Sequence, residues 1–423
     1  MDQFHIIGPN RLSGSVRSSG AKNAALPALA ASLLTEDRLR LTRVPAVRDI
    51  HTMLRLLEHL GVAHRWNGDG LELQPASGGG APPDDAPYSL VKTMRASVLV
   101  LGPLVARLGH ARVSLPGGCA IGARPIDQHL AGLEALGAEV TLDHGYVEAR
   151  AERLAGATYR FSTPTVTGTE NLLMAAALAS GTTRLDNCAR EPEVVDLARL
   201  LTEMGAHIEG AGEESIEIEG VESLGSADHE IISDRIETGT YLIAGAITGG
   251  EVEVEGGRAA DLEPLLEKLD EIGCEVEARA GFIRVSAGDE LVARSIVTAP
   301  YPGYPTDLQA QYMALMTRAR GLSTICETVF ENRFQHVPEL RRMGAEISVE
   351  GRIARVHGPS ALSGAKVMAT DLRASACLVL AALAADGETF VDRIYHLDRG
   401  YQEMELKLQS LGARVRRVSG DRG

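Results

Sequence analysis

The 423-residue sequence lacks several features that would each assign a class of protein at once. Its five cysteines are scattered, odd in number and never spaced C-x-x-C, so we expect free thiols in a reducing compartment and no zinc site. The first ten residues contain no basic segment followed by an apolar run, which a signal peptide would need. The longest apolar run, residues 376–385, is far shorter than a membrane span. We therefore expect a cytoplasmic protein that does not enter a membrane.

Excess positive charge and nucleotide-binding motifs are also missing. The formal net charge of -15 argues against nucleic acid or an anionic membrane surface as a partner, because both attract basic proteins. The sequence has no P-loop, no G-x-G-x-x-G after a strand and no cluster with metal-ligand spacing, so we expect neither a metal nor a cofactor. A few converging arginines can still bind a small anionic substrate, so the net charge does not exclude one.

A phrase repeated six times is the main feature that the sequence does have. An amphipathic segment ends in an apolar residue and a glycine, and alternating sequence that is typical of two short strands follows. A glycine at this point supplies the left-handed residue that closes a helix. The copies are roughly 70 residues apart, and their glycines are Gly61, Gly137, Gly205, Gly273, Gly344 and Gly412.

Each copy is preceded by a second recurring element, a helix that is apolar on most faces and is therefore expected to be buried. Six modules of helices and short strands result, each of which needs neighbours to cover its apolar face. The acidic segment 211–230 is expected to be a loop and to separate two halves of three modules each. The strand-like residues 1–20 could complete either half. A cleft between the halves is the default ligand site. The six buried helices begin near Asn23, Met94, Thr169, Thr238, Asp307 and Asp371.

The stretch S-L-P-G-G-C-A-I-G-A-R-P-I-D-Q-H-L, residues 114–130, is the first candidate for chemistry. It places Cys119 in a glycine-rich loop five residues before Arg124, and a nearby cation makes a thiol easier to ionise. The alternative is a surface turn with an unreactive cysteine. Cys119 with His129 also suggests a thiol hydrolase, but no third group that would orient the histidine can be inferred.

Several charged residues at or inside the apolar helices form a second set of candidates. Lys22 begins the first helix and can meet an anion there, unless it is an ordinary exposed lysine. Arg95 and Arg373 lie in apolar helices, where a cation needs a ligand or a partner, and Asp371 can be that partner.

Asp307 and Arg399 are the last two candidates. Asp307 follows the stiff segment Y-P-G-Y-P-T and can act as a general base, although a capping role for it or for Thr306 would also explain it. Arg399 is expected on a turn, with Asp398 as an ion-pair partner in the simplest interpretation.

Together the motifs resemble the enolpyruvyl transferases of the UDP-N-acetylglucosamine 1-carboxyvinyltransferase family, which open peptidoglycan precursor synthesis and so serve cell-wall biogenesis, cell shape and cell division. The resemblance runs in order from residue 20 to 401. It rests on G-A-K-N-A-A-L-P, K-T-M-R-A-S, L-P-G-G-C-A-I-G-A-R-P-I-D-Q-H, R-E-P-E-V-V-D, S-D-R-I-E-T-G-T-Y, P-T-D-L-Q-A-Q, E-T-V-F-E-N-R-F-Q-H-V-P-E-L-R-R-M-G-A and D-R-G-Y.

The resemblance implies an α/β fold, an inside-out α/β barrel of two domains with three modules each, buried helices and outward sheets. The first domain would be residues 22–232 and the second residues 1–21 with 233–423, and the ligand would lie in the cleft between the domains. The implied reaction transfers the enolpyruvyl group of phosphoenolpyruvate to the 3'-hydroxyl of UDP-N-acetylglucosamine. We expect the protein to be a monomer or to self-associate weakly.

The resemblance also assigns roles to residues. Cys119 would donate a proton, form a covalent adduct and be the thiol that fosfomycin alkylates, while Asp307 would help to deprotonate the sugar hydroxyl. One segment departs from the family pattern, because T-P-T-V-T-G-T-E-N from Thr163 replaces a lysine followed by S-V-G-A-T. Phosphoenolpyruvate would be held by Lys22, Asn23, Arg124 and Arg399, and the nucleotide sugar by Arg95, Arg124, Pro125, Ile126, Asp127, Gln128, His129, Val166, Asp307 and Val329.

Two competing functions remain open. The sister enzyme of the same fold uses shikimate 3-phosphate as acceptor, whereas Cys119 and the R-P-I-D-Q-H sequence favour the sugar nucleotide. A non-catalytic relative that only binds a nucleotide sugar would not require Cys119.

Overall fold

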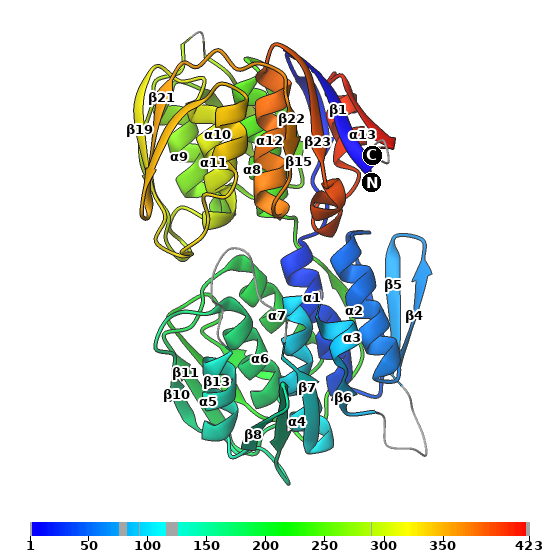
Figure 1. Cartoon of the computed structure of the whole chain (residues 1–423). Coiled ribbons are helices and arrows are strands. Elements are labelled where there is room, and N and C mark those ends of the chain that lie inside the picture. Colours follow the sequence, from blue (N-terminus) through cyan, green and yellow to red (C-terminus); the bar gives the residue numbers. More distant parts are fainter. Residues whose placement is uncertain (1, 76–82, 93, 116–125, 289, 420–423) are drawn as a thin grey trace. The chain divides into compact units, whose positions relative to one another are not determined.

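The computed structural model describes residues 2–75, 83–92, 94–115, 126–288 and 290–419 (Figure 1). These residues divide into two compact units. Unit 1 contains residues 2–19 and the described part of 233–419, and unit 2 contains the described part of 20–115 together with residues 126–232. Each unit has three four-stranded sheets and its own apolar core. Among the residues described, no helix is long and apolar enough to cross a membrane.

Unit 2 packs its most apolar helices inside and its sheets outside. In α1 (Lys22–Ala31), every residue from Ala24 onwards is buried, and in α6 (Val166–Ala176) so is every residue from Gly168 onwards. The other helices are η1 (Ser32–Leu34), α2 (Arg48–His59), α3 (Tyr88–Val91), η2 (Arg95–Val100), α4 (Leu101–Leu108), α5 (Asp127–Ala135) and α7 (Pro192–Glu203). The sheets, in strand order, are β14 (Ala227–Glu230), β3 (Leu39–Thr42), β5 (Gly70–Pro75), β4 (Val62–Asn67); β6 (Asp85–Ala86), β7 (His110–Ser114), β9 (Tyr146–Arg150), β8 (Glu139–Asp143); and β10 (Thr158–Arg160), β11 (Thr182–Asp186), β13 (Ser215–Glu219), β12 (His207–Glu209).

Unit 1 follows the same plan, with α8 (Arg235–Ile247), α10 (Gln309–Met316) and α12 (Leu372–Ala384) packed against one another in its core. The other helices are η3 (Ala259–Asp261), α9 (Glu263–Glu271), η4 (Thr306–Leu308), α11 (Val337–Arg342), η5 (Ile394–Arg399) and α13 (Met404–Ser410). The sheets, in strand order, are β22 (Lys366–Met368), β23 (Gly387–Asp392), β1 (Asp2–Gly8), β24 (Val415–Ser419); β16 (Glu275–Arg279), β17 (Phe282–Ser286), β15 (Glu251–Glu255), β2 (Ser13–Arg17); and β18 (Ile296–Val297), β19 (Gly321–Cys326), β21 (Ile353–Gly358), β20 (Glu346–Glu350).

The six glycines of the repeated phrase have the conformation that their position predicts. Their φ angles lie between 85° at Gly61 and 109° at Gly205, the left-handed region that side chains with a Cβ avoid. They follow α2, α5, α7, α9, α11 and α13, and the next strand begins within a few residues. The helix ends predicted from the sequence are therefore confirmed, and each glycine turns the chain from a helix into a sheet.

The strand pair predicted after each glycine is confirmed for five copies and is wrong for the sixth. In the described residues after Gly412, which end at 419, the one strand is β24, and its antiparallel partner is β1 from the opposite end of the chain. Likewise β2 joins β15 in parallel, so the strand-like lead-in belongs to unit 1. Segments far apart in the sequence thus complete unit 1, a non-local pairing that local patterns do not reveal.

The acidic segment 211–230 is not the loop that the sequence suggested. It contains β13, which pairs with β11, and β14, which pairs in parallel with β3 of the first module. The boundary between the two units lies after it, between residues 232 and 233. The segment therefore closes unit 2 instead of linking two halves.

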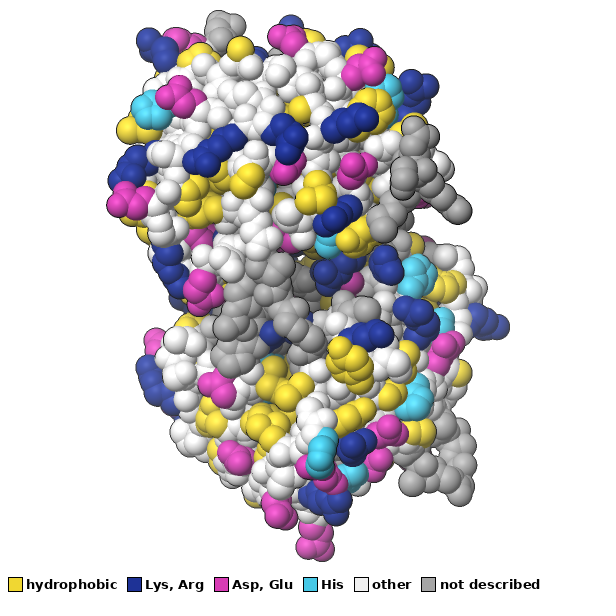
Figure 2. All heavy atoms as spheres, viewed as in Figure 1, with side chains coloured by type: hydrophobic (Ala, Val, Ile, Leu, Met, Phe, Trp, Pro, Cys, Tyr) yellow, Lys and Arg dark blue, Asp and Glu magenta, His cyan; other side chains and the backbone are white. Residues whose placement is uncertain are grey.

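The surface and the thiols agree with the composition. Figure 2 shows lysine and arginine side chains intermixed with aspartate and glutamate on the visible face of the molecule. Of the five cysteines, four lie in the described residues and all four are free, as expected: Cys188, Cys274 and Cys377 are buried and Cys326 is half-buried.

Candidate active site

Lys22 lies at the amino-terminal end of α1 and forms an ion pair inside unit 2. Its Nζ is 3.1 Å from Oδ2 of Asp49 on α2, and only 11% of the lysine side chain and 6% of the aspartate side chain are exposed. An ordinary exposed lysine, the simpler alternative, is therefore wrong. The amino-terminal end of a helix also favours anions, because the first backbone N–H groups have no partner within the helix and point away from it. A lysine held here by a carboxylate has few rotamers left and is suited to meet a bound anion.

Gln128 on α5 binds the segment in which the sequence departs from the family pattern. Its Oε1 accepts a hydrogen bond from the backbone N–H of Ser162 at 2.7 Å, and its Nε2 donates to the carbonyl of Thr163 at 3.1 Å. The Thr165 side chain accepts from the N–H of Gly168 and so caps α6. The first turn of α5 and the start of α6 are therefore held together by side-chain hydrogen bonds.

His129 is a buried, neutral histidine with both ring nitrogens in hydrogen-bond contact with α6. Its Nδ1 lies 3.1 Å from Asn171 Nδ2 and its Nε2 lies 3.3 Å from the hydroxyl of Thr167. Because the amide nitrogen of Asn171 can only donate, Nδ1 accepts and Nε2 carries the proton. Burial, and secondly the positive charge of Arg95, lowers the pKa of His129 to about 4. A histidine in this state connects α5 to α6 and takes up no second proton at neutral pH.

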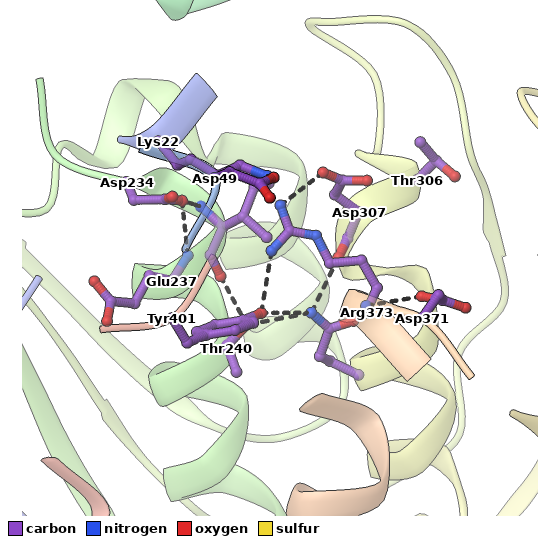
Figure 3. Close-up of polar contacts among 12 residues, drawn as sticks. Lys22, Asp49, Asp234, Glu237, Thr240, Thr306, Asp307, Asp371, Arg373 and Tyr401 are labelled. Atoms are coloured by element: carbon purple, nitrogen blue, oxygen red, sulfur yellow. Dashed lines mark hydrogen bonds and ion pairs between the residues drawn. The ribbon is translucent and has the colours of Figure 1, made fainter. Parts of the chain in front are cut away.

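Asp307 is held between two arginines in unit 1. Its Oδ1 lies 2.5 Å from Arg333 Nη2. Its Oδ2 lies 2.8 Å from Arg373 Nη2, a contact that Figure 3 shows. Both arginines are buried, whereas 28% of the aspartate side chain is exposed. Burial is the largest single effect and acts to lower the pKa of Arg373, but the combined effect of its acidic neighbours, with Asp307 the strongest of them, makes the net shift upward. Two fixed positive charges therefore contact a carboxylate that is partly exposed, and charge-assisted hydrogen bonds of this kind favour its ionised form.

Glu327 is a buried carboxylate that fixes the surroundings of Asp307 and Val329. Its Oε2 accepts from the hydroxyl of Thr306 at 2.9 Å, and its Oε1 accepts from the backbone N–H of Val329 at 2.9 Å. The same Oε1 accepts from Thr298 and from the N–H of Phe330. One side chain therefore sets the position of the turn that carries Val329 and of the residue before Asp307.

Three simple interpretations of the charged residues are wrong. Asp371 does not pair with the Arg373 guanidinium; it caps α12 by accepting from the backbone N–H of Arg373 at 2.8 Å. Asp398 pairs with Arg417, at 2.6 Å, and not with its neighbour Arg399. Neither Thr306 nor Asp307 caps a helix with its side chain. The side-chain partners of Arg373, Asp398 and Thr306 come from segments distant in the sequence, which adjacency along the chain does not predict.

The remaining expected site residues occupy several elements. Asn23 is the second residue of α1, and Arg95, Val166 and Arg399 are half-buried at an end of η2, α6 and η5. Ile126 is buried before α5, and Asp127 is exposed at its start, where a negative charge suits the helix dipole. Cys119, Arg124 and Pro125 lie outside the described residues. Within the described part, no group of three or more His, Cys, Asp or Glu side chains is arranged to hold a metal ion.

Sequence reasoning missed the partners that hold the candidate residues. Asp49, Arg333, Glu327 and Tyr401 were not named as functional candidates, although Arg333 and Tyr401 lie inside the conspicuous stretches E-N-R-F-Q-H and D-R-G-Y. One signal in the sequence could have indicated a buried polar cluster. Gln309 and Gln311 interrupt the largely apolar α10, both are fully buried, and Gln311 contacts Tyr401.

Comparison with known families gives the class of protein that this fold and site define. The family model described as EPSP synthase (3-phosphoshikimate 1-carboxyvinyltransferase) matches residues 6–408. The chain belongs to this family.

Individual proteins show which members of the family the chain is similar to. The chain is 55% identical over 419 residues to the UDP-N-acetylglucosamine 1-carboxyvinyltransferase of Desulfosudis oleivorans, covering 99% of this chain and 100% of the relative. Its structure is similar to that of the enolpyruvyl transferase NikO from Streptomyces tendae, with a TM-score of 0.89, 29% identity and 99% of both chains covered. An EPSP synthase from Acinetobacter baumannii matches with a TM-score of 0.76 and 18% identity over 99% of this chain and 100% of that chain, which shows the shared fold. The expected inside-out α/β barrel is confirmed.

Proposed function

We propose that this protein transfers the enolpyruvyl group of phosphoenolpyruvate to the 3'-hydroxyl of UDP-N-acetylglucosamine and releases phosphate. The observation that carries the proposal is the 55% identity, from end to end, to an enzyme named for that reaction. The sister reaction on shikimate 3-phosphate has weaker support, because the EPSP synthase structure is only 18% identical and shares the fold alone. The product would be an early peptidoglycan precursor, and we place the enzyme in the cytoplasm.

The reaction would proceed by addition and elimination. As the sugar 3'-oxygen bonds to C2 of phosphoenolpyruvate, its proton leaves and the C2–C3 π electrons take a proton at C3. The tetrahedral ketal then loses phosphate from C2 and a proton from C3, which restores the double bond as an enol ether. The chain must therefore supply a proton acceptor at the hydroxyl, a proton donor at C3 and cations for the phosphate and the carboxylate.

Asp307 is the proposed proton acceptor. Its carboxylate is partly exposed, and Arg333 and Arg373 contact one oxygen each. These contacts fix the orientation of the carboxylate but also weaken its basicity, since each arginine favours the ionised form. We infer that Asp307 accepts the hydroxyl proton transiently and passes it on. Val329, which Glu327 fixes nearby in unit 1, would line the nucleotide-sugar site.

The cations are assigned by the family resemblance and by chemistry. Lys22, Asn23, Arg124 and Arg399 would bind phosphoenolpyruvate, because a carboxylate and a phosphate on one small molecule need several fixed donors. Cys119 would donate the proton to C3, form the covalent adduct and react with fosfomycin. A thiol must be protonated to donate, whereas Arg124 favours the thiolate, so the charge of the bound substrate must decide the balance.

The nucleotide-sugar site would use Arg95, Val166 and the segment Arg124, Pro125, Ile126, Asp127, Gln128 and His129. Within that segment His129 would orient its neighbours from a buried position, since both its ring nitrogens contact α6. Gln128 holds the segment at Thr163, and backbone amides or Thr165 there would replace the lysine that some members carry. We propose residues 22–232 as one domain and residues 1–21 with 233–423 as the other, in a monomeric or weakly self-associating enzyme.

One assay tests the proposal. Purified protein is incubated with both substrates, and inorganic phosphate and the mass of the sugar nucleotide are followed over time. Phosphate release that requires both substrates, together with a sugar nucleotide heavier by one enolpyruvyl group, supports the proposal. Release that requires shikimate 3-phosphate instead would overturn it in favour of the sister reaction.

A further inference from the structure

Three core helices of unit 1 each contribute one buried polar side chain to a common cluster. These are Thr240 on α8, Gln311 on α10 and Arg373 on α12, with exposures of 0%, 0% and 6%. A buried polar group without a partner costs about 1–3 kcal/mol, so apolar residues would make these helices more stable. The polar residues must therefore form a network, and they meet at the hydroxyl of Tyr401.

Tyr401 is the fourth member of this network, and its hydrogen-bond roles can be worked out. The hydroxyl of Thr240 donates to the carbonyl of Ile236 at 2.7 Å, so its oxygen is left to accept. Tyr401 then donates to Thr240, at 2.9 Å. With its own proton used, the phenol oxygen accepts from Arg373 Nη1 and from Gln311 Nε2, both at 3.3 Å. Gln311 Nε2 also lies 3.0 Å from the backbone carbonyl of Asp307 and 3.2 Å from the Thr240 hydroxyl, so its two hydrogens are shared among three acceptors.

The consequence for Arg373 is that its guanidinium is held at both ends. Nη1 donates to Tyr401 and Nη2 donates to Oδ2 of Asp307, and in Figure 3 the guanidinium lies between the phenol and the carboxylate. The two acceptors leave one orientation of the planar group that satisfies both, because its donors have a fixed fork geometry. Without the phenol oxygen, Nη1 would lose this acceptor, and Oδ2 of Asp307 would be the remaining side-chain acceptor that orients the guanidinium.

We propose that Tyr401 is a positioning residue, whose hydroxyl fixes the Arg373 guanidinium and, through it, the orientation of the Asp307 carboxylate. The inference rests on the proposed function, because the orientation of Asp307 matters there for removal of the sugar hydroxyl proton. Small displacements of a catalytic group reduce the rate strongly, and a displacement of 1 Å can reduce it by about 100-fold. Tyr401 needs no contact with either substrate to exert this effect.

The test compares Tyr401→Phe with Tyr312→Phe in the full-length protein. Both tyrosines are buried in unit 1, but the Tyr312 hydroxyl donates to the backbone carbonyl of Arg294, at 3.1 Å, and within the described residues it makes no hydrogen bond to the network. Tyr401→Phe should lower kcat about tenfold while KM for UDP-N-acetylglucosamine changes less than about twofold. Tyr312→Phe should lose similar stability and keep its kcat, because a purely structural hydroxyl affects only the amount of folded enzyme.

A second variant and a crystal structure keep the proposal falsifiable. Thr240→Val removes the acceptor of the phenol proton and should lower kcat in the same direction by less. If Tyr401→Phe retains the wild-type kcat, or loses no more than Tyr312→Phe, the inference is overturned. If the wild-type protein lacks enolpyruvyl transfer, the proposed function fails independently, and the structure of Tyr401→Phe then decides. An Arg373 that keeps its place there also overturns the positioning role, and one that turns away from Asp307 supports it.

Discussion

Lys22 forms an ion pair with Asp49, with 3.1 Å between Nζ and Oδ2, in a part of unit 2 where little of either side chain is exposed. The pair joins the start of α1 to the first turn of α2. A charge that loses its partner where little water reaches it lowers the free energy of unfolding strongly, whereas exposed ion pairs contribute little to that free energy. The pair therefore has two consequences: it stabilises unit 2, and it orients the amine that we propose binds phosphoenolpyruvate.

Asp49→Asn should separate these consequences. We expect a loss of unfolding free energy on the order of 2 kcal/mol, because Lys22 keeps a hydrogen-bond acceptor but loses its counter-charge. We also expect KM for phosphoenolpyruvate to rise more than KM for UDP-N-acetylglucosamine. Glu222→Gln is the control, since Glu222 pairs with Arg153 but 87% of its side chain is exposed. Urea unfolding in which both variants behave alike would contradict the structural role of the pair.

Asp307→Asn removes the proposed proton acceptor and the counter-charge of two buried arginines. We expect kcat to fall by about 100-fold or more, since an amide accepts no proton. We also expect a loss of stability of about 3 kcal/mol, because Arg333 and Arg373 keep their charges in a buried place. Glu350→Gln, at a carboxylate 83% exposed and paired with Arg355, should change neither quantity. An Asp307→Asn enzyme with wild-type kcat would exclude Asp307 as the acceptor.

His129 predicts a pH dependence of stability. Its pKa in the folded protein is about 4, below the ordinary value of 6.5. As the pH falls below 6.5 the unfolded chain binds a proton that the folded chain does not, so stability decreases between pH 6.5 and pH 4. The contribution of His129 to this loss should be about 2 kcal/mol at pH 5.

The measurement compares wild type with His129→Gln by urea unfolding at pH 7.5 and pH 5. The variant should lose less stability over this range than the wild type does. His144→Gln, at a side chain that is 88% exposed, should lose as much as the wild type. If wild type and His129→Gln lose equal amounts, His129 is not the neutral, buried group described here.

Cys119→Asp tests the proposed role of the thiol. An aspartic acid can also donate a proton, so the variant should keep part of the turnover. It should resist fosfomycin, because alkylation needs a sulfur nucleophile. Rapid and irreversible inactivation of the variant would show that fosfomycin reacts elsewhere.

The local part of the fold could be predicted from the sequence. Helix ends at Gly61 and Gly205 and the strand pairs that follow depend on residues within one module, and short-range patterns record them. The pairing of β24 with β1 depends on the two ends of the chain meeting, which no local pattern encodes. The repeated phrase revealed the number of modules, and only the structure revealed which strands complete each sheet.

The candidate site also has a part that the sequence predicts and a part that it does not. Lys22 and Asp307 could be identified as candidates because a charged residue at the amino-terminal end of an apolar helix is unusual. Their partners Asp49, Arg333 and Arg373 contact them across 26 to 66 residues of sequence, and adjacency instead suggested the wrong partner Asp371 for Arg373. Side-chain pairing between modules is set by tertiary packing, so it could not be read from spacing.

The most direct measurement of the central claim is phosphate release with phosphoenolpyruvate and one of two acceptors, UDP-N-acetylglucosamine or shikimate 3-phosphate. The account predicts release with the sugar nucleotide only, a product that carries the enolpyruvyl group at the 3'-oxygen, and a strong loss of rate in Asp307→Asn. Release with shikimate 3-phosphate alone, or no release with either acceptor, would contradict it.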